Sequence, residues 1–167
     1  MAVRKQEKRR WHRVRPVVAA VVAAVVVGGA WFALSVLNGP AGGVIVADPT
    51  DRELVRLGRT VYTEQCASCH GADLEGQPDW RSRLPDGSLR APPHDETGHT
   101  WHHPDAQLFE VVKEGGQAVV PEGFKSNMPA FGGSLSDREI LASLAYIKSR
   151  WPAEIRRRHD QISRRAR

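Results

Sequence analysis

The pentapeptide Cys66-Ala67-Ser68-Cys69-His70 places two thiols and an imidazole in the spacing Cys-x-x-Cys-His. This spacing is the signature for covalent attachment of a c-type haem. The thiols add across the two vinyl groups of haem, and the adjacent His70 then lies where its imidazole can bind the iron from one face. The chain has no other cysteine, which excludes a disulfide framework and a four-cysteine zinc site. We therefore expect one haem c, attached through Cys66 and Cys69, with His70 as an axial ligand.

Met128 is the second residue with iron-binding chemistry. The chain has two methionines, and the other one is Met1, so Met128 offers the single internal thioether. A lone methionine is more often a core residue than a ligand. Here the upstream haem motif and the following Pro129 favour ligation of the haem iron. Coordination by His70 and Met128 would raise the reduction potential and fill both axial positions, which favours electron transfer over oxygen binding.

Further along the chain, four histidines fall within one stretch of ten residues: His94, His99, His102 and His103. One interpretation is a second metal site, for instance for copper, because imidazole suits that ion. Another is a histidine as the sixth haem ligand. The remaining interpretations are a hydrogen-bond network to the haem propionates, or the start of a helix at Pro104. The sequence leaves these alternatives open.

The charge of the chain is concentrated at its two ends. Residues 1–15 carry a net charge of +6 and residues 150–167 carry +5, whereas the residues between them carry −6. The basic footprint of a nucleic-acid-binding domain is therefore missing from the central part, and we expect no nucleic-acid partner. Residues 153–167 are predicted to be a basic C-terminal tail. It is either a disordered solubilising segment or a contact for anionic lipid or an acidic partner.

Residues 16–37 are predicted to be a transmembrane anchor, because the run from Val17 to Leu37 contains no charged residue and has the length of a membrane-spanning helix. The basic segment 1–15 should stay in the cytoplasm, which places the rest of the chain outside. The alternative is a cleaved signal peptide, which gives the cysteines the same location. We expect a single-pass protein of the bacterial inner membrane with its haem domain on the periplasmic or outer side.

Three amphipathic helices are expected after a flexible linker at residues 38–49. The first two run from about residue 51 to 66 and from 104 to 114. The third begins at a capping box, Ser-x-x-Glu, and covers about residues 136–151. Residues 71–103 form a long loop with little periodicity, and a haem would supply the apolar surface that such a loop needs.

The pattern Gly-x3-aromatic-x3-Cys-x-x-Cys-His resembles the class I (monohaem) cytochrome c family, here in a membrane-anchored bacterial form. Gly58 and Tyr62 complete the pattern in front of the haem motif. The resemblance covers about residues 50–152 and implies an all-α fold with three main helices around the covalent haem. In this family the glycine lets the first helix cross the last one closely, where a tyrosine, here Tyr146, packs against the first helix.

The resemblance also implies partners for the two axial ligands. A proline carbonyl in the long loop accepts a hydrogen bond from the second ring nitrogen of the proximal histidine, and Pro92 and Pro93 are both candidates. Class I cytochromes place their methionine ligand in a turn of the kind that surrounds Met128.

The expected function is electron transfer, without enzymatic activity. A membrane-tethered c-type cytochrome would cycle between Fe(II) and Fe(III) in a respiratory chain, between membrane or periplasmic redox partners. These partners would be an oxidase, a dehydrogenase or a quinol-oxidising complex. One alternative is a haem relay subunit of a larger oxidase or dehydrogenase complex. The other is metal handling, for instance of copper, through the His94–His103 cluster.

Overall fold

The structure is a computed structural model that describes residues 45–166. The predicted cytoplasmic segment, the anchor at residues 16–37 and the first part of the linker lie outside the described residues. Within residues 45–166, no helix is both long and apolar enough to cross a membrane.

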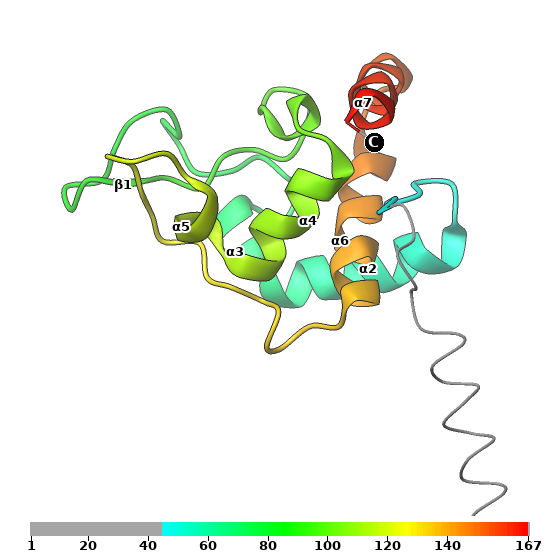
Figure 1. The fold of residues 1–167 in the computed structure, drawn as a ribbon, viewed down its shortest axis with the longest axis horizontal. Helices are drawn as coiled ribbons and strands as arrows, with labels where there is room; N and C mark the ends of the chain where they lie inside the picture. Colours follow the sequence, from blue (N-terminus) through cyan, green and yellow to red (C-terminus); the bar gives the residue numbers. More distant parts are fainter. Residues whose placement is uncertain (1–44, 167) are drawn as a thin grey trace, which may run out of the picture. The chain divides into compact units, whose positions relative to one another are not determined.

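The described chain is mostly helical, as predicted (Figure 1). Its longer helices are α2 (Arg52–Gln65), α4 (Asp105–Glu114), α6 (Asp137–Arg150) and α7 (Ala153–Arg165). The short helical segments are α3 (Ala67–His70), α5 (Gly116–Val119) and the 3-10 helix η1 (Thr100–His102). The strands β1 (Ser88–Leu89) and β2 (Lys125–Ser126) form one parallel pair, with Ser88 opposite Lys125 and Leu89 opposite Ser126.

Side-chain caps define where the first and last predicted helices begin. The carboxylate of Asp51 accepts hydrogen bonds from the backbone N–H groups of Glu53 and Leu54 at the start of α2. At the start of α6, Ser136 and Glu139 form the predicted capping box, in which each side chain accepts from the backbone N–H of the other. These local interactions explain why the sequence predicted both helix starts within one or two residues.

Gly58 allows α2 and α6 to cross in direct contact. A Cβ at this position would overlap the backbone carbonyl of Ala142 and lie 3.0 Å from Tyr146 Cβ. The crossing contact is therefore the one that the class I resemblance implied. Ser143 lies in the same buried region, and its hydroxyl donates to the carbonyl of Ile140 at 2.8 Å, so this polar group is satisfied within its own helix.

The hydrophobic core lies where α2, α4 and α6 pack together, and it extends to the loop after the haem motif and to the segment before α2. Burial of these side chains removes apolar surface from water and holds the helices around the motif. The core residues are Ala47, Leu54, Tyr62, Leu74, Leu108, Phe109, Ile140, Ala142, Leu144, Ala145, Ile147 and Trp151.

A buried ion pair joins α4 to α6. Lys148 Nζ donates to both carboxylate oxygens of Asp105, at 2.8 and 2.9 Å, and each side chain is only 3% exposed. Asp105 Oδ2 also accepts from the N–H of Ala47 at 3.2 Å. On the other side, the Asp105 N–H donates to Ser163 Oγ at 3.1 Å, and His159 Nε2 lies 3.5 Å from Asp105 Oδ1. Asp105 therefore connects four separate parts of the chain.

Helix α7 shows that residues 153–165 are not a disordered tail, which was one of the two interpretations of this segment. Its inner face is buried through His159 and Ser163, one helical turn apart, and α7 packs beside η1 (Figure 1). The packed helical unit therefore continues past residue 152, where the haem domain was predicted to end. The arginines of α7 remain largely on its outer side, because the buried polar network occupies the inner one.

Candidate functional site

The haem motif forms the short helix α3 directly after α2. The N–H of Cys66 donates to the carbonyl of Tyr62 at 2.9 Å, which makes Cys66 the C-terminal cap of α2. Both cysteines are free thiols, and Cys69 is exposed whereas Cys66 is partly buried. Burial, together with the neighbouring Cys69, raises the pKa of the Cys66 thiol to about 11, so it stays protonated at neutral pH.

Tyr62 holds the end of the motif in place. Its hydroxyl donates to the carbonyl of Gly71 at 3.0 Å and lies 3.4 Å from the carbonyl of His70. Gly71 adopts a φ of +83°, a left-handed conformation that suits glycine, where the chain turns away from α3. Burial, with Cys66 close by, raises the pKa of Tyr62, so the phenol remains a neutral donor.

The His70 imidazole is buried and oriented by Pro92. His70 Nδ1 lies 2.9 Å from the carbonyl oxygen of Pro92, so Nδ1 carries the proton and Nε2 keeps a free lone pair. Of the two prolines that the sequence left open, this contact selects Pro92 over Pro93. Burial lowers the pKa of His70, against the opposing effect of the bond to Pro92. The ring is therefore held in the neutral form that binds metal ions.

Met128 lies on the loop between β2 and α6. Its N–H donates to Ser126 Oγ at 3.3 Å, and its carbonyl accepts from the N–H of Gly116 at 3.1 Å. A Cβ at Gly116 would lie 3.0 Å from Met128 Cβ, so the absence of a side chain there permits this close approach. Three residues further on, the Phe131 N–H donates to the carbonyl of Val112 at 3.0 Å. The thioether is therefore carried by a loop that is tied to α4 and α5.

The four histidines downstream of the motif divide into two groups. His94 lies next to His70, with ring centroids 4.0 Å apart. The other three lie with two tryptophans: His99 stacks on Trp80, His102 stacks on Trp101, and His103 meets His99 edge to face. Within residues 45–166, no group of three or more His, Cys, Asp or Glu side chains is arranged to hold a metal ion. His94 thus contacts the haem motif, whereas the rings of His99, His102 and His103 contact Trp80, Trp101 and one another.

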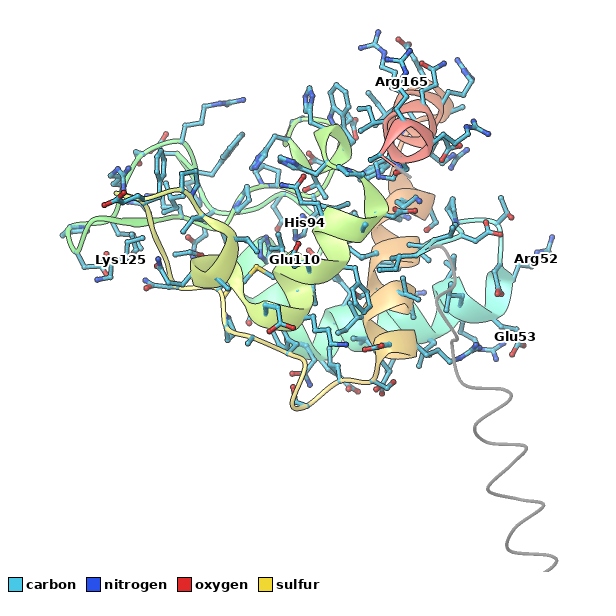
Figure 2. The ribbon with its side chains drawn as sticks, viewed as in Figure 1. Arg52, Glu53, His94, Glu110, Lys125 and Arg165 are labelled. Atoms are coloured by element: carbon cyan, nitrogen blue, oxygen red, sulfur yellow. The ribbon has the colours of Figure 1, made fainter. Side chains whose placement is uncertain are left out.

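The position of His94 also bears on the alternative of a histidine as sixth haem ligand. The planes of the His94 and His70 rings differ by 21°, so the two rings are stacked face to face. With its ring on the face of His70 instead of opposite Nε2, His94 would not be placed to hold the iron from the other side. Figure 2 shows His94 toward the centre of the helical domain, whereas Lys125 and Arg165 lie at its periphery.

Two contacts of His94 have no signal in the sequence. Trp151 Nε1 donates to the carbonyl of His94 at 2.7 Å, and His94 Nδ1 lies 2.8 Å from Thr100 Oγ1. The first contact joins residues 57 positions apart, beyond the reach of any periodic pattern. The sequence shows a polar residue, Thr100, between His99 and Trp101, but nothing in it indicates that this residue is buried.

A family model described as cytochrome C oxidase, cbb3-type, subunit III, matches residues 53–147, a span that runs from α2 into α6. The chain belongs to this family. Its cofactor is covalently attached haem c. The donor set fits this group, because it combines two free thiols, a neutral imidazole with Nε2 available and a thioether on a hydrogen-bonded loop.

The chain is similar to cytochrome c-555 of Prosthecochloris aestuarii, with 33% identity over 98 residues that cover 54% of this chain and 81% of that protein. It is also similar to the cytochrome c subunit of the Mycobacterium bovis cytochrome bc1 complex, with 33% identity over 75 residues, 45% of this chain and 25% of that protein. The chain thus spans about a quarter of the mycobacterial relative. Among solved structures it is similar to cytochrome CL from the marine methylotroph Methylophaga aminisulfidivorans, with 23% identity, a TM-score of 0.47 and coverage of 66% and 63% of the two chains.

Proposed function

We propose that this protein is a membrane-tethered c-type cytochrome that carries single electrons between redox partners on the outer side of a bacterial inner membrane. Its membership of a cytochrome c family supports electron transfer. The observation that carries the assignment of the site is the geometry of His70, a buried neutral imidazole oriented by Pro92 beside two free thiols. Cys66 and Cys69 would hold the haem through thioether bonds, and His70 and Met128 would bind its iron.

The bound haem supplies an iron centre that gains and loses one electron. The residues of the chain set the conditions for this exchange. The carbonyl of Pro92 fixes the His70 ring and increases the basicity of Nε2. The Met128 thioether raises the reduction potential relative to a second histidine. With His70 and Met128 both bound to the iron, oxygen or peroxide would find no open coordination position, which favours an electron carrier over an enzyme.

The charge pattern before residue 45 supports the membrane tether. A basic segment followed by an uncharged run of membrane-spanning length is typical of a single-pass anchor with its N-terminus in the cytoplasm. Such an anchor raises the effective concentration of the haem domain near membrane-bound partners. Haem should therefore remain with the membrane fraction of producing cells after a high-salt and alkaline wash. Release of the haem protein into the wash would instead indicate a cleaved signal peptide.

The names of the similar proteins support a second candidate, a haem relay subunit of a larger complex. The family description refers to an oxidase subunit, and a similar protein is a subunit of a bc1 complex. An oxidase or a quinol-oxidising complex is therefore the partner that we propose. Mild detergent extraction followed by size separation distinguishes the two roles, because a carrier migrates alone whereas a relay subunit co-migrates with further redox subunits.

Replacement of Met128 tests the axial ligand assignment. In full-length, haem-loaded Met128→Ala protein, we expect loss of the weak charge-transfer band that marks a sulfur–iron bond in the oxidised state. The reduction potential should also fall, by a substantial fraction of the about 0.8 V over which different axial ligands set haem potentials. Glu122→Ala, an exposed position on the preceding segment between α5 and β2, serves as the control and should leave both properties unchanged. An unaltered band in Met128→Ala would exclude Met128 as the ligand.

A further inference from the structure

The ring of His94 stacks on the ring of the proposed axial ligand His70. Its ring centroid lies 4.0 Å from that of His70, with an angle of 21° between the planes. Two flat rings in this arrangement are in van der Waals contact over their faces, so neither ring can rotate about its Cβ–Cγ bond without displacing the other. The contact is thus able to fix the orientation of the His70 ring.

His94 is itself held in a fixed position by three interactions. Its Nδ1 lies 2.8 Å from Thr100 Oγ1, its N–H donates to the carbonyl of Leu74 at 2.7 Å, and its carbonyl accepts from Trp151 Nε1 at 2.7 Å. Thr100, Leu74 and Trp151 are all buried, so they belong to the packed interior rather than to a mobile surface. The His94 ring therefore has one defined place against which another ring can be positioned.

The hydrogen bond from His70 to Pro92 leaves a degree of freedom that His94 restricts. A single bond at Nδ1 fixes the direction of one ring atom, and hydrogen-bond directions at carbonyl oxygens are broadly distributed. The ring can still tilt about the line through Nδ1. A flat surface against the ring face opposes this tilt, because any change of plane brings ring atoms into overlap.

We propose that His94 is a positioning residue that holds the plane of the His70 ring, and that Thr100 holds His94 in turn. This inference rests on the proposed role of His70 as an axial ligand. The orientation of an axial imidazole determines how its π orbitals align with those of the iron, and partners outside the coordination sphere commonly control it. An aliphatic side chain at position 94 would fill the space but would lack the flat face that sets the plane.

The test compares His94→Leu, His94→Phe and Thr100→Val in the full-length, haem-loaded protein. The readouts are the proton NMR shifts of the haem methyl groups and the g values of the oxidised low-spin iron, both of which report the orientation of the axial ligand ring. His102→Leu is the matched control, because His102 is exposed and stacks on Trp101 instead of a haem ligand. The charge-transfer band and the spectrum of the denatured haem in pyridine are recorded in parallel.

We expect His94→Leu to change the spread of the methyl shifts and the g values. His94→Phe should change them much less, because its ring is also flat although it loses the hydrogen bond to Thr100. Thr100→Val should shift them in the same direction as His94→Leu by a smaller amount, and His102→Leu should leave them unchanged. Wild-type values in His94→Leu, or equal changes in the Phe and Leu variants, would overturn the proposal.

If His94→Leu does not retain haem, Thr100→Val decides the matter, because wild-type values there would refute the positioning role. The parallel spectra separate the two levels of inference. A wild-type protein without thioether-linked haem or without the charge-transfer band contradicts the proposed function. If the protein has thioether-linked haem and the charge-transfer band, but the methyl shifts do not change in the variants at position 94, then only the proposed role of His94 is contradicted.

Discussion

Replacement of Lys148 by methionine should strongly destabilise the haem domain. Lys148 Nζ donates to both oxygens of Asp105, and both side chains are 3% exposed, so water cannot replace the lost partner. Methionine retains the unbranched apolar stem of lysine and removes its charge. The buried Asp105 carboxylate would then be stabilised only by the hydrogen bond from Ala47 and by the nearby His159.

The expected loss is about 3–5 kcal/mol, the usual cost of removing one partner of a buried ion pair, and the bond from Ala47 places it toward the lower end of that range. Such a loss is a large part of the about 5–15 kcal/mol that stabilises a typical domain. The double variant Asp105→Leu/Lys148→Met should recover part of the stability, because an apolar pair is commonly as stable as a buried ion pair. The recovery is incomplete, because the buried N–H of Ala47 loses its acceptor.

The assay is guanidinium unfolding of the full-length, haem-loaded protein, followed by the tryptophan fluorescence that haem quenches in the folded state. Lys113→Met is the control, since Lys113 pairs with Asp137 at 2.8 Å but with side chains 35% and 48% exposed. The control should lose less than about 1 kcal/mol. The reasoning is refuted if Lys148→Met also loses less than about 1 kcal/mol, or if the double variant is less stable than the single one.

Three further predictions concern stability. Gly58→Ala should lower the free energy of unfolding by at least about 1 kcal/mol in thermal unfolding, because the new Cβ overlaps the Ala142 carbonyl. This loss is expected although alanine has a higher helix propensity than glycine by about 1 kcal/mol. The control Gly133→Ala has open space around it and should cost little. Burial, and to a lesser extent the charge of Lys148, lowers the pKa of His159 in the folded protein. The unfolded chain therefore binds a proton at His159 more readily, and stability falls as the pH drops below about 6.5. His159→Gln should show a smaller fall in melting temperature on acidification, and an equal fall would contradict the assignment. Haem-free protein should lose most of its helical circular dichroism, because about 100 residues form only a thin core; a well-folded haem-free form would show otherwise.

The sequence by itself determined the features that depend on near neighbours in the chain. The five residues from Cys66 to His70 define the haem chemistry, because two thiols and an imidazole on one helical turn need no distant partner. The capping box at Ser136 predicted the start of α6 for the same reason. Gly58 was recognised from its fixed spacing to the motif, and the structure supplies its partner in α6.

The tertiary structure alone decided the contacts between residues far apart in sequence. It selected Pro92 over Pro93, because that choice depends on the path of a long loop past His70. It separated His94 from the other three histidines, although one short segment carries all four.

Asp105 gives the clearest case of this kind. An aspartate in the first turn of a helix ordinarily interacts with the helix dipole, yet Asp105 forms a buried ion pair with Lys148, 43 positions away. No periodicity encodes such a pair, because the charges meet only after α4 and α6 have packed. The packing of α7 through His159 and Ser163 has the same origin. Both residues contact Asp105, so the buried face of this basic helix is defined only once α4 has placed Asp105.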